Sequence, residues 1–386
     1  MGFLKKIYIK YITPIILLAL LSCTQPIAFK NMIIGGSGYF MFGENPSRTF
    51  YRNLSIEPDI NLKWSVETSG SQTNTSIIIY DNILFVGDLS GKLYAFDRTT
   101  GKMFGYEKYT GSLSVAPIVS NLRIFILLNQ FNEKYSVLKL FDYMNGNVLL
   151  ESKLYGSVQN EMLKLNDGII VLTDQGEIIK FNLIGSREWS VNTTVTSKSS
   201  PASNGDIILF GNEKGELIAV SSQTGEIKYR TKISGSIEGD FTIEGEYAYF
   251  GDNNGKLFCA EVKDGKVMWS VNTKNKILSA PVMNNENVFV GNLAGEIFCF
   301  NKLSGNLIWK TETGGIINTT PTLFKNYLVQ PDLNRKIYFI DTNNGAITKT
   351  YDYEKRVKLS PVYYDGILYL GTDKGIINAY QISNKE

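Results

Sequence analysis

The chain has 386 residues, of which 43% are hydrophobic and 20% charged, a balance typical of a folded globular protein rather than a disordered one. This length exceeds one ordinary core and suits two domains or one array of repeats. The net charge of +2 gives no reason to expect nucleic acid or an acidic surface as a partner. The sequence contains no histidine, which excludes Ser-His-Asp and Cys-His enzymes and removes the commonest zinc ligand.

The N-terminal segment is typical of an export signal. Three lysines precede an apolar run over residues 11–21, which is too short for a comfortable transmembrane helix. The run ends in Leu-Leu-Ser-Cys at residues 20–23, which resembles the cleavage site of bacterial lipoproteins. We therefore expect residues 1–22 to be a lipoprotein signal peptide and Cys23 to be the lipidated N-terminus. Two alternatives are an ordinary secretory signal, in which the cysteine is incidental, and an uncleaved anchor.

The lipoprotein interpretation also predicts a location. Thr24 stands where an Asp would be the usual signal for retention at the inner membrane. We therefore expect a protein of the cell envelope that is lipid-anchored in the outer membrane and faces the periplasm.

Residues 23–59 are expected to form the lipidated N-terminus, a tether and a lead-in to the folded domain. Within them, Gly35-Gly36-Ser37-Gly38 lacks both the Lys-Ser/Thr and the helix that follow the glycines of a phosphate-binding loop. Its composition favours a flexible tether. A strand pattern, INLKWSVETSG, follows at residues 60–70 with no repeat unit ahead of it.

A unit of about forty residues then recurs eight times. Its marker is a Gly that follows two strand-type residues, and in degraded copies another residue stands in place of this Gly. The eight marker positions are Gly87, Asn129, Thr173, Gly211, Gly251, Gly291, Gln330 and Gly371. A proline about ten residues ahead of the marker repeats independently, at Pro117, Pro201, Pro281, Pro321 and Pro361. All four tryptophans share one column near the end of the unit, and we interpret them as structural packing residues: Trp64, Trp189, Trp269 and Trp309.

Each unit shows short alternating strands separated by turns, with no helical periodicity. A period near forty with four short strands is typical of a β-propeller blade, which buries both faces only by stacking against neighbours around an axis. We therefore predict an all-β protein in which residues 60–386 form an eight-bladed β-propeller of four-stranded antiparallel blades. The last unit lacks its tryptophan strand, so the orphan strand at 60–70 is expected to complete that blade and close the ring.

The columns resemble the pyrroloquinoline-quinone-type repeat, whose form is Ala-x-Asp-x-x-Thr-Gly-x-x-x-Trp. The first unit has Ala95, Asp97, Thr100 and Gly101, and residues 41–50 resemble the lead-in of such proteins. A lipid-anchored ring of eight such repeats is similar to the BamB family. That resemblance implies a periplasmic scaffold without catalytic activity, whose partners are the outer-membrane barrel assembly machine and unfolded barrel precursors.

The resemblance does not extend to the contact residues of that family. Its partner-binding loop carries a Leu-x-Leu-Arg run, whereas the corresponding residues 194–203 here offer only Val195 and Lys198. The acidic pair expected in the next loop has only Glu238 and Asp240 nearby, out of register. No partner-binding residue is therefore predicted from the family.

Two alternatives to the scaffold are a propeller that binds a small molecule or an envelope polysaccharide, and a quinone-dependent oxidoreductase. The quinone enzymes of this repeat family use adjacent cysteines, a calcium site and a catalytic Asp, and no adjacent cysteines occur here. We therefore expect no cofactor, no metal and no catalytic residue. The irregular units between about 120 and 195 could hold a binding surface or reflect drift.

The remaining polar residues have simpler explanations. Cys259 and Cys299 share a column of small residues and are expected to be buried free thiols. Asp97, Asp142 and Asp341 precede turn glycines and are expected to bond the local backbone. The charged stretch at residues 351–360 is expected to be a solvated loop.

Overall fold

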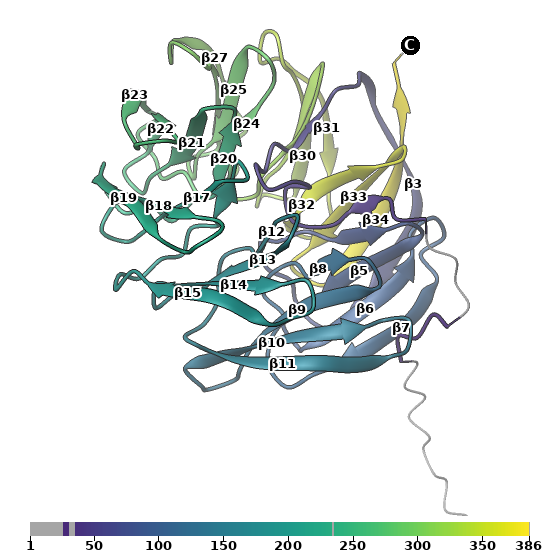
Figure 1. Cartoon of the computed structure of the whole chain (residues 1–386). Coiled ribbons are helices and arrows are strands. Elements are labelled where there is room, and N and C mark those ends of the chain that lie inside the picture. The colour runs from purple at the N-terminus through teal and green to yellow at the C-terminus, as the bar shows by residue number, and fades with distance from the viewer. Residues whose placement is uncertain (1–25, 31–34, 234, 386) are drawn as a thin grey trace, which may run out of the picture.

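The computed structural model describes residues 26–30, 35–233 and 235–385, and these ranges contain strands and turns but no helix (Figure 1). Eight sheets are arranged as the blades of a propeller, each built on four antiparallel strands; short strands β1 (Gly38–Tyr39) and β2 (Tyr51–Arg52) extend two of the sheets to five strands. The predicted all-β, eight-bladed fold is confirmed. The cleavage and lipidation expected at residues 1–23 lie outside the described residues. Among the described residues, no helix could cross a membrane.

The first four blades use the strands of the first half of the chain. Blade 1 contains β4 (Ile78–Tyr80), β5 (Ile83–Gly87), β6 (Lys92–Asp97) and β7 (Met103–Lys108). Blade 2 contains β8 (Ile118–Ser120), β9 (Arg123–Asn129), β10 (Tyr135–Asp142) and β11 (Asn147–Tyr155). Blade 3 contains β12 (Leu163–Lys164), β13 (Gly168–Leu172), β14 (Glu177–Asn182) and β15 (Arg187–Asn192). Blade 4 contains β16 (Ala202–Ser203), β17 (Ile207–Gly211), β18 (Glu216–Ser221) and β19 (Ile227–Lys232).

The last four blades follow in the same order. Blade 5 contains β20 (Phe241–Glu244), β21 (Tyr247–Gly251), β22 (Lys256–Glu261) and β23 (Val267–Asn272). Blade 6 contains β24 (Val282–Met283), β25 (Asn287–Gly291), β26 (Glu296–Asn301) and β27 (Leu307–Glu312). Blade 7 contains β28 (Thr322–Phe324), β29 (Tyr327–Pro331), β30 (Lys336–Asp341) and β31 (Ile347–Asp352). Blade 8 contains β32 (Val357–Tyr364), β33 (Ile367–Thr372) and β34 (Ile376–Asn384), and its fourth strand comes from the N-terminal part of the chain.

That fourth strand is β3 (Ile56–Glu67), which pairs antiparallel with β34 and places Trp64 opposite Ala379. The predicted closure by the orphan tryptophan strand is therefore confirmed. The strand begins at Ile56, four residues before the predicted repeat. Its pairing removes the open edge that an unclosed ring would leave.

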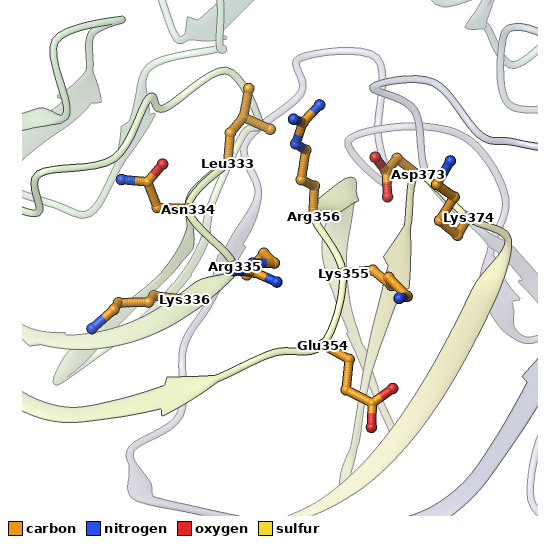
Figure 2. Close-up of a pocket in the computed structure, with 9 residues that line it drawn as sticks. All are labelled: Leu333, Asn334, Arg335, Lys336, Glu354, Lys355, Arg356, Asp373 and Lys374. Carbon is orange, nitrogen blue, oxygen red and sulfur yellow. The ribbon is translucent and has the colours of Figure 1, made fainter.

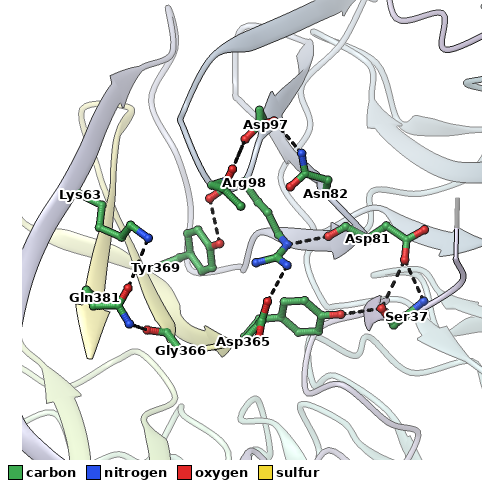
Figure 3. A network of polar contacts seen from close by, with 12 residues as sticks. Ser37, Lys63, Asp81, Asn82, Asp97, Arg98, Asp365, Gly366, Tyr369 and Gln381 are labelled. Atoms are coloured by element: carbon green, nitrogen blue, oxygen red, sulfur yellow. Dashed lines mark hydrogen bonds and ion pairs between the residues drawn. The ribbon is translucent and has the colours of Figure 1, made fainter. Parts of the chain in front are cut away.

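The seam between blades 8 and 1 is held by polar contacts around Arg98 (Figure 3). Its guanidinium donates to the carbonyl of Asp81 and to the carboxylate of Asp365, both at 2.7 Å. Its carbonyl accepts from the hydroxyl of Tyr369 at 3.0 Å and from the indole of Trp64 at 3.1 Å. Arg98 of blade 1 thus joins its own sheet to the β32–β33 turn, to β33 and to β3 of blade 8. The first and last parts of the chain meet at this seam.

The tryptophan column has one geometry throughout the ring. Each indole Nε1–H donates to a backbone carbonyl of the next blade, at Arg98, Ser222, Lys302 and Thr342, over 3.0 to 3.3 Å. Each ring also covers a left-handed turn glycine of that blade: Gly101, Gly225, Gly305 and Gly345. The tryptophans therefore join adjacent blades, because the glycine turn has no side chain to hold the indole away.

Replacing Gly305 by Ala should show how much this contact contributes. A Cβ there would lie 2.8 Å from the Trp269 ring, at a φ of +71° that L-residues rarely adopt. We expect a loss of about 2 to 4 kcal/mol in the free energy of unfolding, from backbone strain plus overpacking. Gly314→Ala is the matched control, because its φ is +77° but nothing lies within 4 Å of the added atom. Denaturant unfolding of both variants measures the difference, and equal losses would contradict this role of the indole.

The two shared-column cysteines lie in the core and are free, Cys259 at 2% and Cys299 at 0% exposure. Burial raises the pKa of their thiols, to about 11 for Cys259 and about 12 for Cys299. Both therefore stay protonated and unreactive at neutral pH.

The three turn aspartates bond the local backbone. The carboxylate of Asp97 accepts from the N–H groups of Thr99 and Thr100, each at 2.9 Å. Asp142 and Asp341 accept from the N–H two residues further on in the same way. These carboxylates stabilise turns and are not gathered into one site.

Candidate interaction surface

The segment before β3 crosses the centre of the ring. We call residues 39–55 the axial segment; Figure 1 shows its purple trace beside the inner strands. At its start, β1 (Gly38–Tyr39) pairs with β4, and further on β2 (Tyr51–Arg52) pairs with β28. In between, backbone N–H groups of Val119, Ser203 and Ile243 donate to carbonyls of the segment. The segment thus contacts the inner edges of blades 1, 2, 4, 5 and 7.

Arg48 anchors the axial segment and is fully buried. Its guanidinium donates to four backbone carbonyls, those of Phe42, Glu161, Met162 and Pro201, at 2.7 to 3.1 Å. Three of these carbonyls belong to blades 3 and 4, more than a hundred residues away in the sequence. One side chain therefore ties the segment to two neighbouring blades.

Two carboxyl groups lie near this guanidinium. Burial raises the pKa of Glu161 to about 7, although the charge of Arg48 opposes the shift. Burial also raises the pKa of Asp240, again against the same guanidinium. Because one cation faces two carboxyls, the site holds one negative charge more readily than two.

The axis of the ring is crossed by the chain itself. The axial segment contacts the inner strands there, and no group of three or more His, Cys, Asp or Glu side chains in the described ranges could hold a metal ion. Asp240 lies near the guanidinium of Arg48, whose charge opposes the rise in its pKa. The arrangement suits a structural centre.

The loops that correspond to the family's partner-binding site are internally paired. Val195 is buried, and Lys198 forms an ion pair with Glu213 at 3.0 Å. Glu238 forms an ion pair with Lys276 at 2.8 Å, which helps to hold its pKa below the usual value although burial acts in the other direction.

Residues 120–195 do not form one patch. The apolar run of blade 2, residues 124–128, is strand β9 and is buried in the core. Phe131 and Tyr155 are exposed at 54% and 64%, whereas the body of the two blades is packed normally. The irregularity of these units therefore reflects longer strands in blade 2 as much as exposed side chains.

The Gly35–Gly38 stretch differs from a free tether. Backbone N–H groups of Gly35, Gly36 and Ser37 donate to the carboxylate of Asp81, and Gly38 pairs in β1. These bonds help to lower the pKa of Asp81 against the opposing effect of burial. The chain is thus fixed to blade 1 from residue 35 onward.

A cleft of about 760 Å³ opens between blades 7 and 8, and we call it the basic cleft (Figure 2). Three loops form it: the β29–β30 turn, the β31–β32 loop and the β33–β34 turn. Five cations and two carboxylates line it together with Leu333 and Asn334: Arg335, Lys336, Lys355, Arg356, Lys374, Glu354 and Asp373. Part of the charged stretch predicted to be a solvated loop therefore lines a concave site.

Arg335 breaks a glycine column at this cleft. The equivalent turn position is a glycine with positive φ in six other blades: Gly91, Gly176, Gly215, Gly255, Gly295 and Gly375. Arg335 adopts the same left-handed conformation, with φ of 66°, at a cost of about 1 to 2 kcal/mol for a residue with a Cβ. This departure from the repeat is the sequence signal that could have indicated the cleft.

The eight blades and the tryptophans that dock between them are typical of one class of protein, the quinoprotein-type β-propeller. In this chain the N-terminal segment crosses the centre of the ring. The family described as outer membrane protein assembly factor BamB matches residues 133–241, 230–315 and 293–385. The chain belongs to this family.

The comparisons include sequence relatives of one kind and solved structures of several kinds. A curated relative from Nitrosomonas eutropha, "Outer membrane protein assembly factor BamB", is 30% identical over 183 residues, 45% of this chain and 43% of the relative. The chain spans about half the length of the curated relatives it matches. The crystal structure of BamB from Moraxella catarrhalis matches with a TM-score of 0.72 and 16% identity, over 84% of this chain and all of that one. A quinohemoprotein alcohol dehydrogenase from Comamonas testosteroni also has a TM-score of 0.72, at 10% identity over 89% of this chain and 80% of its own.

Proposed function

We propose that the protein is a non-catalytic scaffold of the cell envelope, anchored through a lipid on Cys23 and facing the periplasm, that binds other proteins during assembly of outer-membrane β-barrels. Family membership over residues 133–385 is the observation that carries this proposal. The crossing of the axis by residues 39–55 supports it, because a ligand in the channel would compete with the chain itself. The likeness to the dehydrogenase supports the fold alone.

Capture of partners from the envelope tests this function. The tagged full-length protein is captured from detergent-solubilised envelopes, and the proteins retained are identified by mass spectrometry. We expect components of the barrel assembly machine, absent from a capture with an unrelated lipoprotein carrying the same tag. Recovery of no such component would overturn the assembly role.

The anchor is tested separately by membrane fractionation of a Cys23→Ser variant. Loss of the only proposed acylated residue should release the protein from the outer-membrane fraction. A variant that still fractionates with the outer membrane would show that Cys23 is not the anchor, without bearing on the scaffold role.

A further inference from the structure

We propose that the basic cleft and the groove that continues from it bind an acidic segment of a partner protein that carries apolar side chains at one end. The inference rests on the proposed function in one respect, that the occupant is a protein. Unpaired charge, two broken repeat columns and the apolar extension of the cleft support it.

Four of the five cations of the cleft have no partner among the described residues, and only Lys336 forms an ion pair there, with Asp352 at 3.8 Å. Arg335, Lys355, Arg356 and Lys374 form no ion pair or side-chain hydrogen bond with any residue in the described ranges, and Figure 2 shows them rising from facing loops. Some lysines elsewhere on the surface are paired, such as Lys228 with Glu226 and Lys310 with Glu312, but the basic cleft gathers several unpaired cations in one recess. Like charges held close together repel one another, and an anion entering between them removes that repulsion.

The strained Arg335 points to the same conclusion. A glycine would satisfy the turn, as in six other blades, and within the described ranges the guanidinium forms no ion pair or hydrogen bond that would offset the strain of its backbone. Strain that the fold does not need is typical of a functional position. Arginine is also the cation best suited to a planar carboxylate, which it binds through two parallel hydrogen bonds.

The cleft continues into a second groove of about 280 Å³, which shares Glu354 and Lys355 with it. The lining of this groove is mixed: Leu62, exposed at 58%, lies there with Tyr353 and Tyr380, and polar residues such as Asp352 and Asn378 complete it. The two regions form one path from a basic end to an end where apolar and aromatic side chains are available.

A second repeat column is broken at the floor of this groove. Asn378 stands where other blades place a large apolar side chain, such as Tyr94, Phe258 and Phe298. Its amide nitrogen donates to the hydroxyls of Tyr353 at 2.7 Å and Tyr380 at 3.1 Å. Its buried oxygen has no partner within the described part of the chain, so the polar residue leaves an unsatisfied acceptor beside the groove.

The lining distinguishes a peptide from a phosphate or a lipid surface. Glu354 and Asp373 lie among the cations and would repel a polyanionic headgroup, whereas a chain with spaced carboxylates can avoid them. A flat membrane surface does not reach a recess between two blades. The exposed Leu62 and the two tyrosines of the groove have no use in binding phosphate, and they fit apolar side chains of a peptide.

The test measures binding of a defined probe to the purified full-length protein. The probe is a fluorescein-labelled peptide with alternating Asp and Gly residues followed by Leu-Tyr-Leu, and affinity is read by fluorescence anisotropy. We expect binding that weakens as salt rises and that weakens about 10-fold when the Leu-Tyr-Leu end is replaced by Ser-Ser-Ser. A peptide with Lys in place of Asp should not bind.

Two substitutions locate the probe. Arg335→Gly restores the repeat residue, so it should raise the melting temperature while it lowers affinity for the probe, and adding Arg356→Glu should lower affinity by about 10-fold or more. Lys228→Glu, outside the cleft, makes the same charge change as Arg356→Glu and should alter affinity less than about 2-fold.

Equal losses in the cleft and control variants would overturn the proposal, as would the absence of probe binding. Inorganic phosphate or phosphatidylglycerol vesicles that displace the probe and depend on Arg335 and Arg356 would show an anionic phosphate site instead. Because the assay uses purified protein, its failure is distinguishable from a failure to capture the assembly machine from envelopes.

Discussion

Replacing Arg48 by Met is expected to lower the free energy of unfolding by about 3 to 5 kcal/mol, because the change breaks a buried network of charges and hydrogen bonds. The substitution leaves four carbonyls without their donor and two carboxyl groups without their counter-charge. The axial segment depends on such contacts, because Glu44, Arg48 and Phe50 all adopt left-handed backbone conformations that are locally unfavourable. Losing the anchor should therefore release the segment from the centre of the ring.

Denaturant unfolding measures the loss, and limited proteolysis within residues 39–55 shows whether the segment is released. Arg187→Met is the control, since the side chain of Arg187 is 43% exposed and its contact with Glu177 is a 3.5 Å surface pair worth at most about 1 kcal/mol. Adding Glu161→Gln and Asp240→Asn to Arg48→Met should recover part of the stability, because no buried charge is then left unpaired. An Arg48→Met variant as stable as the parent would show that the segment does not need its guanidinium.

Stability is expected to fall as the pH rises from about 5 to about 8, and Glu161 is the main cause. The pKa of this carboxyl is raised by burial from an ordinary 4.5 to about 7, so folding favours its protonated form. Its contribution is therefore fully present below the unfolded pKa of 4.5 and is lost as the pH rises through about 7. The shift corresponds to at most about 3 kcal/mol. Asp240, whose pKa is also raised, acts in the same direction, and Arg48 is the cation that faces both.

The chain has no histidine, so few other groups titrate in this range, and the effect should be visible in the whole protein. Unfolding free energies measured across the range should fall for the parent and be nearly flat for Glu161→Gln, whose amide oxygen can still accept from the N–H of Ala116. Glu151→Gln, at an exposed surface pair, should leave the slope unchanged. A slope that survives Glu161→Gln would assign the dependence to another group, of which Asp240 and the partly buried Glu107 are the next candidates, since burial raises both pKa values.

The repeat made most of the fold predictable. The period of the repeat and its tryptophan column predict eight blades, and the unmatched ends of the repeat array predict closure by β3. Both follow because each blade can bury its faces only against another blade of the same pattern. The prediction stopped short where residues lie outside the repeat. The Gly35–Gly38 stretch has the composition of a tether, yet it is held by Asp81, an interaction 44 to 46 residues away that composition does not encode.

The basic cleft shows the same limit at a candidate site. Its cations come from three separate loops, and a net charge of +2 conceals their convergence. Arg335 in a glycine column was a visible signal, but its meaning depends on knowing that the loop with Lys355 and Arg356 lies across from it. Asn378 was equally visible as a polar residue in an apolar column, and only the tertiary structure shows that its amide joins Tyr353 and Tyr380.

The amino-acid sequence alone determined the number of blades, their strand order and the closure of the ring by β3. A local pattern repeated eight times covers every apolar face when the repeats form a closed ring. The tertiary structure decided what occupies the centre and where charge gathers on the rim. Arg48 finds carbonyls more than a hundred residues away, and the cations of the cleft meet across two blades. Both depend on distances set by ring closure, which no local pattern contains.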